Sequence, residues 1–143
     1  MPAKVIDIAD AVKEELNGHT FSQPFTAERA YQPTFELADM QTLHVTVVPK
    51  SVTTAIASRS GDQVDYAVDI GVQKKLGENP DTDADEMMAL VEEIAGFLNR
   101  RGLAGTPGMV WVRTQNEPIF SPEHFEQLRQ FTSVLTVTYR ALE

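Results

Sequence analysis

The sequence predicts an α+β fold: a largely antiparallel sheet with two main helices packed on one face. Apolar residues alternate with polar ones from Gln63 to Leu76, a period of two that helical spacing does not produce. Two other segments, residues 4–17 and 84–101, repeat their apolar residues with a helical period. The order of strands, helix and further strands favours an α+β arrangement.

The alternating strand is the central element of this prediction. One row of its side chains is apolar and belongs to a core: Val64, Tyr66, Val68, Ile70 and Val72. The other row contains Asp65 and Asp69 with no counter-charge in the same row. We therefore expect this second face to meet water or a polar partner.

The segment before this strand predicts a helix and two strands. Apolar side chains recur at helical spacing from Val5 to Leu16, and Asn17-Gly18 is a helix stop. Residues 25–31 alternate as a strand between two prolines. A second strand runs from Leu43 to Val48.

Residues 51–61, which we call the arm, have the sequence S-V-T-T-A-I-A-S-R-S-G. They are small and rich in hydroxyl groups, and they show no convincing alternation. We interpret the arm as a long loop or a ragged hairpin arm, mobile in the free protein and ordered by a partner.

The second helix is predicted at about residues 84–101. Asp83 and Glu86 have the spacing of a capping box. Arg100 and Arg101 occupy the expected last turn, before Gly102. Both helices should pack on the apolar row of the central strand, with these residues largely buried: Ile8, Val12, Val68, Ile70, Leu90, Ile94 and Phe97.

Three further elements complete the prediction. Residues 109–114 form a short strand, Ser121 caps a short helix that begins at Pro122, and residues 131–141 form the last strand. A chain of 143 residues is long enough for a sizeable core, so we expect one domain over residues 1–143.

Composition excludes several classes of function. A net charge of −9 argues against sequence-independent nucleic-acid binding and against adhesion to an anionic membrane. The absence of cysteine excludes disulfides, thiolate metal sites and a cysteine nucleophile. The charged N-terminal segment does not read as a signal peptide, so we expect the protein to stay in the compartment where it is made.

No catalytic or metal-binding constellation stands out. Asp81, Asp83 and Asp85 are spaced like the start of a calcium loop, but Glu86 occupies the position where that loop needs glycine. Acids at a helix N-terminus are the ordinary explanation. The histidines lack metal-ligand spacing and no nucleotide-binding loop is present. We expect no catalytic residue, no metal and no cofactor.

The candidate interface residues lie in the arm and on the polar row of the central strand. Arg59 is the only charged residue of the arm, and a presented arginine is a common interface anchor, although a solvated loop arginine is the alternative. The residues we select are Val52, Ile56, Arg59, Asp65 and Asp69.

The layout resembles the tail terminator and tail-completion proteins of long-tailed bacteriophages. The resemblance rests on an opening helix I-D-I-A-D-A-V-K-E-E-L and on the pair L-H-V-T-V-V-P and V-D-Y-A-V-D-I-G-V around a small-residue arm. The acidic helix D-A-D-E-M-M-A-L-V-E-E-I and the final strand S-V-L-T-V-T-Y-R extend it over nearly the whole chain.

This resemblance implies a structural subunit of a hexameric ring. Such a ring caps the tail tube, stops its polymerisation and offers a surface to the head connector or stopper protein, in the virion and, during assembly, in the host cytoplasm. DNA would pass the lumen without specific binding, which suits the acidic charge. The alternatives are another neck protein, such as a head-closure protein, and a small cytosolic enzyme or ligand-binding domain.

Overall fold

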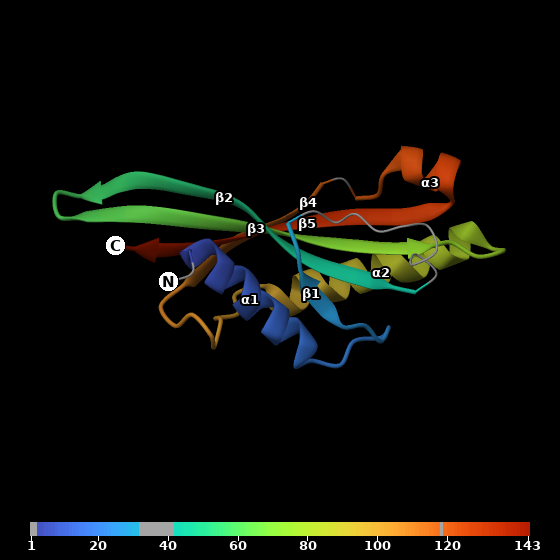
Figure 1. Ribbon diagram of the computed structural model, residues 1–143, viewed down its shortest axis with the longest axis horizontal. Coiled ribbons are helices and arrows are strands. Elements are labelled where there is room, and N and C mark those ends of the chain that lie inside the picture. Colours follow the sequence, from blue (N-terminus) through green and yellow to red (C-terminus); the bar gives the residue numbers. More distant parts are fainter. Residues whose placement is uncertain (1–2, 32–41, 118) are drawn as a thin grey trace.

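The computed structural model describes residues 3–31, 42–117 and 119–143 (Figure 1). These residues form a five-stranded sheet with strand order β1-β2-β3-β5-β4, and three helices. The elements are α1 (Lys4–Asn17), β1 (Ala27–Arg29), β2 (His44–Ser58), β3 (Gly61–Lys75), α2 (Pro80–Leu98), β4 (Val110–Asn116), α3 (Pro122–Leu128) and β5 (Gln130–Leu142).

The predicted fold class is confirmed. The pairs β2–β3, β3–β5 and β4–β5 are antiparallel, and only the short β1 runs parallel to its neighbour β2. Helices α1 and α2 lie on the same side of the sheet (Figure 1). Because three of these four pairings are antiparallel, the sheet is largely antiparallel, as its sequence pattern predicts.

The core lies between the two helices and the sheet face that carries the apolar row of β3, with α1 nearest β2 and β3 and α2 nearest β5. The alternation in β3 places every second side chain on this face, and the helical period of α1 and α2 supplies the opposing stripe. Six of the seven residues expected in the core are fully buried: Ile8, Val12, Val68, Ile70, Leu90 and Ile94.

Phe97, the seventh of these residues, is only partly buried. Its ring stacks on His19 with a centroid distance of 4.3 Å, and Phe21 meets it edge-on at 5.5 Å. The Arg101 guanidinium lies 4.2 Å from the centre of the same ring. Phe97 therefore belongs to an aromatic cluster at the edge of the core, where the α1–β1 connection folds over α2.

Helix α2 begins earlier than its sequence predicts, and the capping-box assignment is wrong. Pro80 occupies the first helical position, where its missing N–H costs no hydrogen bond. Asp83 thus lies inside the first turn, and its carboxylate accepts a hydrogen bond of 2.7 Å from the backbone N–H of Gly77. Asp83 fastens the β3–α2 connection to the helix instead of capping it.

The same helix also ends earlier than expected. Its last residue is Leu98, and Arg100 adopts a left-handed backbone with φ of 59°. A left-handed residue cannot continue an α-helix. Arg100 and Arg101 are therefore outside the last turn, and Arg101 instead pairs with Glu15 of α1, with an N–O distance of 3.1 Å.

The N- and C-terminal elements follow their predictions closely. Helix α1 has the predicted bounds, whereas β1 is shorter than the predicted strand. Asn17 holds β1 to α1 through two hydrogen bonds with the backbone of Ala27, of 2.7 and 3.1 Å. Ser121 caps α3 by accepting a hydrogen bond from the backbone N–H of His124, as its place before Pro122 indicates.

Candidate subunit interface

The arm is a two-stranded hairpin whose register shifts between Pro49 and Ser51 and again between Ile56 and Ser58, so the loop alternative is wrong and the hairpin alternative is confirmed. β2 and β3 are both 15 residues long and remain paired from His44 and Gln73 to Ser58 and Gly61. The arm side chains from Ser51 to Ser60 are all exposed, and for this reason they show no apolar alternation. Cross-strand hydrogen bonding, which any residue except proline supports, carries the strand through this stretch.

Within the described residues, the arm is supported along one edge only. β5 pairs with β3 as far as Gln63, and the backbone of Glu143 exchanges hydrogen bonds of 2.7 and 2.8 Å with Asp62. On the other edge, β1 pairs with β2 only between residues 45 and 47, so among the described residues the arm part of β2 has a free edge. The end of the arm projects past α1 (Figure 1).

The side chain of Glu143 also ties the base of the arm to α1. It forms an ion pair with Lys4 and accepts a hydrogen bond of 3.1 Å from the Tyr66 hydroxyl. The hydrogen bond from Lys4 lowers the pKa of Glu143 below its ordinary value. Glu143, which follows β5, thus connects the base of the hairpin to α1.

The apolar arm residues selected from sequence continue the core row beyond the helices. Val52 pairs with Tyr66 and Ile56 with Asp62, so both side chains lie on the sheet face that α1 covers further along. Val52 is 49% exposed and Ile56 is 86% exposed. Single exposed aliphatic side chains are common on protein surfaces, but these two extend the core row and are available for a contact with another chain.

Arg59 lies in the turn at the tip of the arm and is exposed. Among the residues that the structure describes, it forms no ion pair. The arm thus combines an apolar side chain and a free cation at its end.

Asp65 does have a counter-charge, on the neighbouring strand. It lies opposite Arg140 of β5, whose Nε and Nη2 donate hydrogen bonds of 2.8 and 3.2 Å to the two carboxylate oxygens. These hydrogen bonds lower the pKa of Asp65 below its ordinary value. The register between β3 and β5 places these two residues opposite each other, and the sequence pattern of β3 alone does not specify that register.

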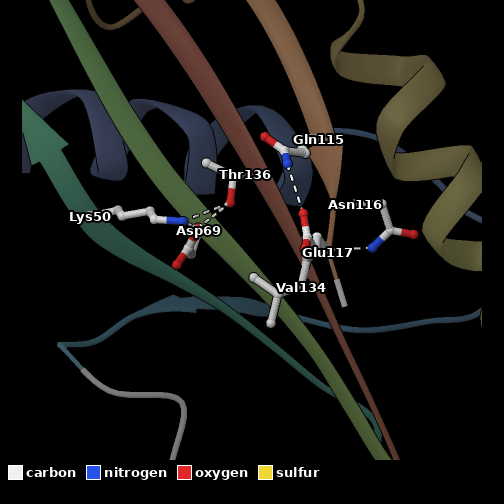
Figure 2. A network of polar contacts seen from close by, with 7 residues as sticks. All are labelled: Lys50, Asp69, Gln115, Asn116, Glu117, Val134 and Thr136. Atoms are coloured by element: carbon white, nitrogen blue, oxygen red, sulfur yellow. Dashed lines mark hydrogen bonds and ion pairs between the residues drawn. The ribbon is translucent and has the colours of Figure 1, made fainter. Parts of the chain in front are cut away.

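Asp69 also finds partners on the strands beside it (Figure 2). The Thr136 hydroxyl of β5 donates a hydrogen bond of 2.6 Å to its Oδ1, and Lys50 Nζ of β2 lies 3.6 Å from the same oxygen. Each of the two aspartates therefore has a basic partner within the chain, Arg140 for Asp65 and Lys50 for Asp69. Their carboxylates remain partly accessible, with 18% and 27% of the side chain exposed for Asp65 and Asp69.

Helices α1 and α2 carry most of the net negative charge instead. Helix α2 carries six carboxylates and no basic residue, and α1 carries four carboxylates with two lysines. The outer sheet face, in contrast, balances its two aspartates with Lys50 and Arg140. An acidic field around this protein thus originates from the helix layer.

A second surface, which sequence reasoning missed, is an apolar groove between α2 and α3. It is an open groove of about 260 Å³, lined by Asp81, Ala84, Asp85, Met88, Ile119, Phe120, Phe125 and Phe131. Ile119 and Phe120 are exposed although they are large and apolar. The signal in the sequence was this apolar pair in a connection between a strand and a proline-started helix.

The described residues contain no group of three or more histidines and carboxylates placed to hold a metal ion. Within the same residues, no helix has the length and apolar character needed to cross a membrane.

No protein-family model and no curated protein matches the chain. Among the solved structures that match the chain, two illustrate the shared fold. A chain of the virion of a native gene transfer agent particle superposes with a TM-score of 0.59 and 14% identity, covering 99% of this chain and 100% of the other. A chain of the sheath/tube terminator of an extracellular contractile injection system, PVC, in the extended state, superposes with a TM-score of 0.52 and 20% identity.

The second alignment covers 100% of this chain, which spans only 58% of that terminator chain. At these identities the likeness shows a shared fold. The α+β fold of this protein, with its mixed sheet and two main helices, is thus a fold that occurs in a tail terminator and in a virion.

Proposed function

We propose that this chain is a structural tail protein that caps the tail tube as a hexameric ring, ends its polymerisation and joins it to the head connector or stopper protein. The observation that carries the proposal is the fold, which is shared over the whole chain with a sheath/tube terminator. The proposal places the protein in the virion tail or neck and, during assembly, in the host cytoplasm. It assigns no catalytic residue and no cofactor.

The exposed arm supports this role because a ring subunit needs a surface that a neighbouring subunit can bury. Ile56 and Val52 offer apolar area, and Arg59 offers a charge. Asp65 and Asp69 lie on the opposite sheet face, where polar contacts with the tube protein or the next ring can form. DNA passes the lumen without specific binding, because the net charge of −9 repels phosphates.

Removing the protein during particle production tests this function. A terminator limits tube growth, so tails made without it should have no defined length and should fail to join heads. A head-closure protein acts on the head side, and its loss should leave tails of normal length beside unattached heads. Unchanged particles would contradict any role in the tail and would favour a small cytosolic enzyme or binding domain.

A further inference from the structure

The arm tip and the groove between α2 and α3 are complementary surfaces of one chain. We propose that the arm tip of one copy docks in the groove of a second copy, with Ile56 on its apolar floor and Arg59 beside the carboxylates of Asp81 and Asp85. The proposal rests on the ring proposed above and names the contact that closes it.

The apolar part of the contact matches in size and chemistry. The apolar lining of the groove includes Met88, Phe120 and Phe125. The groove volume of about 260 Å³ is far above the ~10–15 Å³ that is needed to hold one water molecule, which leaves room for an aliphatic side chain. Ile56, which is 86% exposed on the tip, is such a side chain, and its burial would remove apolar area from water on both surfaces.

The charged part is also complementary. Asp81 and Asp85 are exposed, and their spacing of four residues places both carboxylates on one side of α2, at the rim of the groove. Neither carboxylate forms an ion pair within the described part of the chain, and the same holds for Arg59. A guanidinium beside two carboxylates forms charge-assisted hydrogen bonds, which also fix its orientation.

The positions of the two surfaces explain why the occupant is a second copy. The arm tip lies at one end of the long axis, and α3 with the beginning of α2 lies at the other (Figure 1). A chain with unlike, complementary patches at its two ends associates head to tail, and such an association closes into a ring when the rotation permits. Each copy then inserts its own arm and receives that of its neighbour.

A single contact of this kind is small. Stable interfaces bury about 800 Å² on each partner, and a hairpin tip in one groove covers less than that. The free protein should therefore associate weakly. When the ring closes on a tube end, the contacts of all its subunits act together and should give a higher overall affinity.

Charge reversal gives the first test. Arg59→Glu alone and the double variant Asp81→Lys/Asp85→Lys should each weaken self-association about tenfold or more, because like charges then face each other. An equimolar mixture of the two should restore association, since every mixed contact is again complementary. The controls are Arg113→Glu and Asp7→Lys/Glu14→Lys, which change exposed charges elsewhere. Sedimentation velocity at high concentration measures the effect, and circular dichroism confirms folding.

Cysteine cross-linking gives a second test with different substitutions. The chain has no cysteine, so Ile56→Cys with Met88→Cys introduces a unique pair. Oxidation should yield a ladder of dimers and higher oligomers, whereas each single variant should give no product beyond a dimer. Gln115→Cys with Met88→Cys is the control, because Gln115 lies exposed on the outer sheet face. The ladder should disappear when Arg59→Glu is added.

The outcomes separate this contact from the proposed function. Products of the Ile56–Met88 pair that never exceed a dimer overturn the contact, and so does cross-linking of the groove to a tube protein instead. If tail length becomes undefined without the protein but no ladder forms, the terminator role stands and this contact is wrong. If the ladder forms but tail length does not depend on the protein, the contact stands and the function is wrong.

Discussion

Ile94 offers the sharpest test of the packing between α2 and the sheet. Its side chain is fully buried, at 0% exposure, within the core cluster. Ile94→Ala removes three carbon atoms, and burial of each contributes about 0.8 kcal/mol. The cavity left behind adds to this loss, so the free energy of unfolding should fall by about 2–5 kcal/mol.

The same substitution at Ile56 is a matched control. Ile56 is 86% exposed, so Ile56→Ala should change the free energy of unfolding by no more than about 0.5 kcal/mol. Urea unfolding of both variants, followed by circular dichroism, measures the difference, with the slope m checked for constancy. Equal effects of the two substitutions, or a loss below about 0.5 kcal/mol for Ile94→Ala, would refute this account of the core.

Three further predictions concern the polar contacts and the arm. Asp65→Asn should cost about 0.5–1 kcal/mol at neutral pH. Because the pKa of Asp65 is lowered in the folded protein, the difference in the free energy of unfolding between the two proteins should be complete above the ordinary aspartate pKa. It should vanish as the pH falls through the lowered pKa of the folded protein. A difference that stays constant down to acid pH would contradict the pairing with Arg140. Asp83→Ala should cost about 1 kcal/mol in thermal unfolding, through loss of the Gly77 hydrogen bond, and unchanged stability would show that this bond is unimportant. Replacing residues 56–62 by Asn-Gly, a two-residue turn, should preserve the circular dichroism spectrum while abolishing attachment to tubes; attachment at the normal level would exclude a role for the arm tip.

Much of the fold is contained in local sequence patterns. The bounds of α1 follow from its apolar period and from Asn17-Gly18, and β3 follows from its long alternation. Both ends of α2 were misplaced, for local reasons that are visible afterwards: Pro80 starts the helix and the left-handed Arg100 stops it. The arm lacked a pattern because neither of its faces is buried in the chain.

The candidate site was less accessible to sequence reasoning because it depends on contacts between distant segments. The counter-charges of Asp65 and Asp69 come from β5 and β2, through a register that no single strand specifies. The groove arises where α2 meets the connection before α3, about 30 residues later in the chain. The arm residues could be selected because the arm lies between two predicted strands and because Arg59 is its only charged residue.

We propose above that this chain closes as a ring on the end of a tail tube. Electron microscopy of purified tubes mixed with the purified protein measures this directly. We expect a closed hexameric ring at one end of each tube and no further growth when tube subunits are added. Binding along the length of the tube, or tubes that continue to grow past the bound protein, would contradict it.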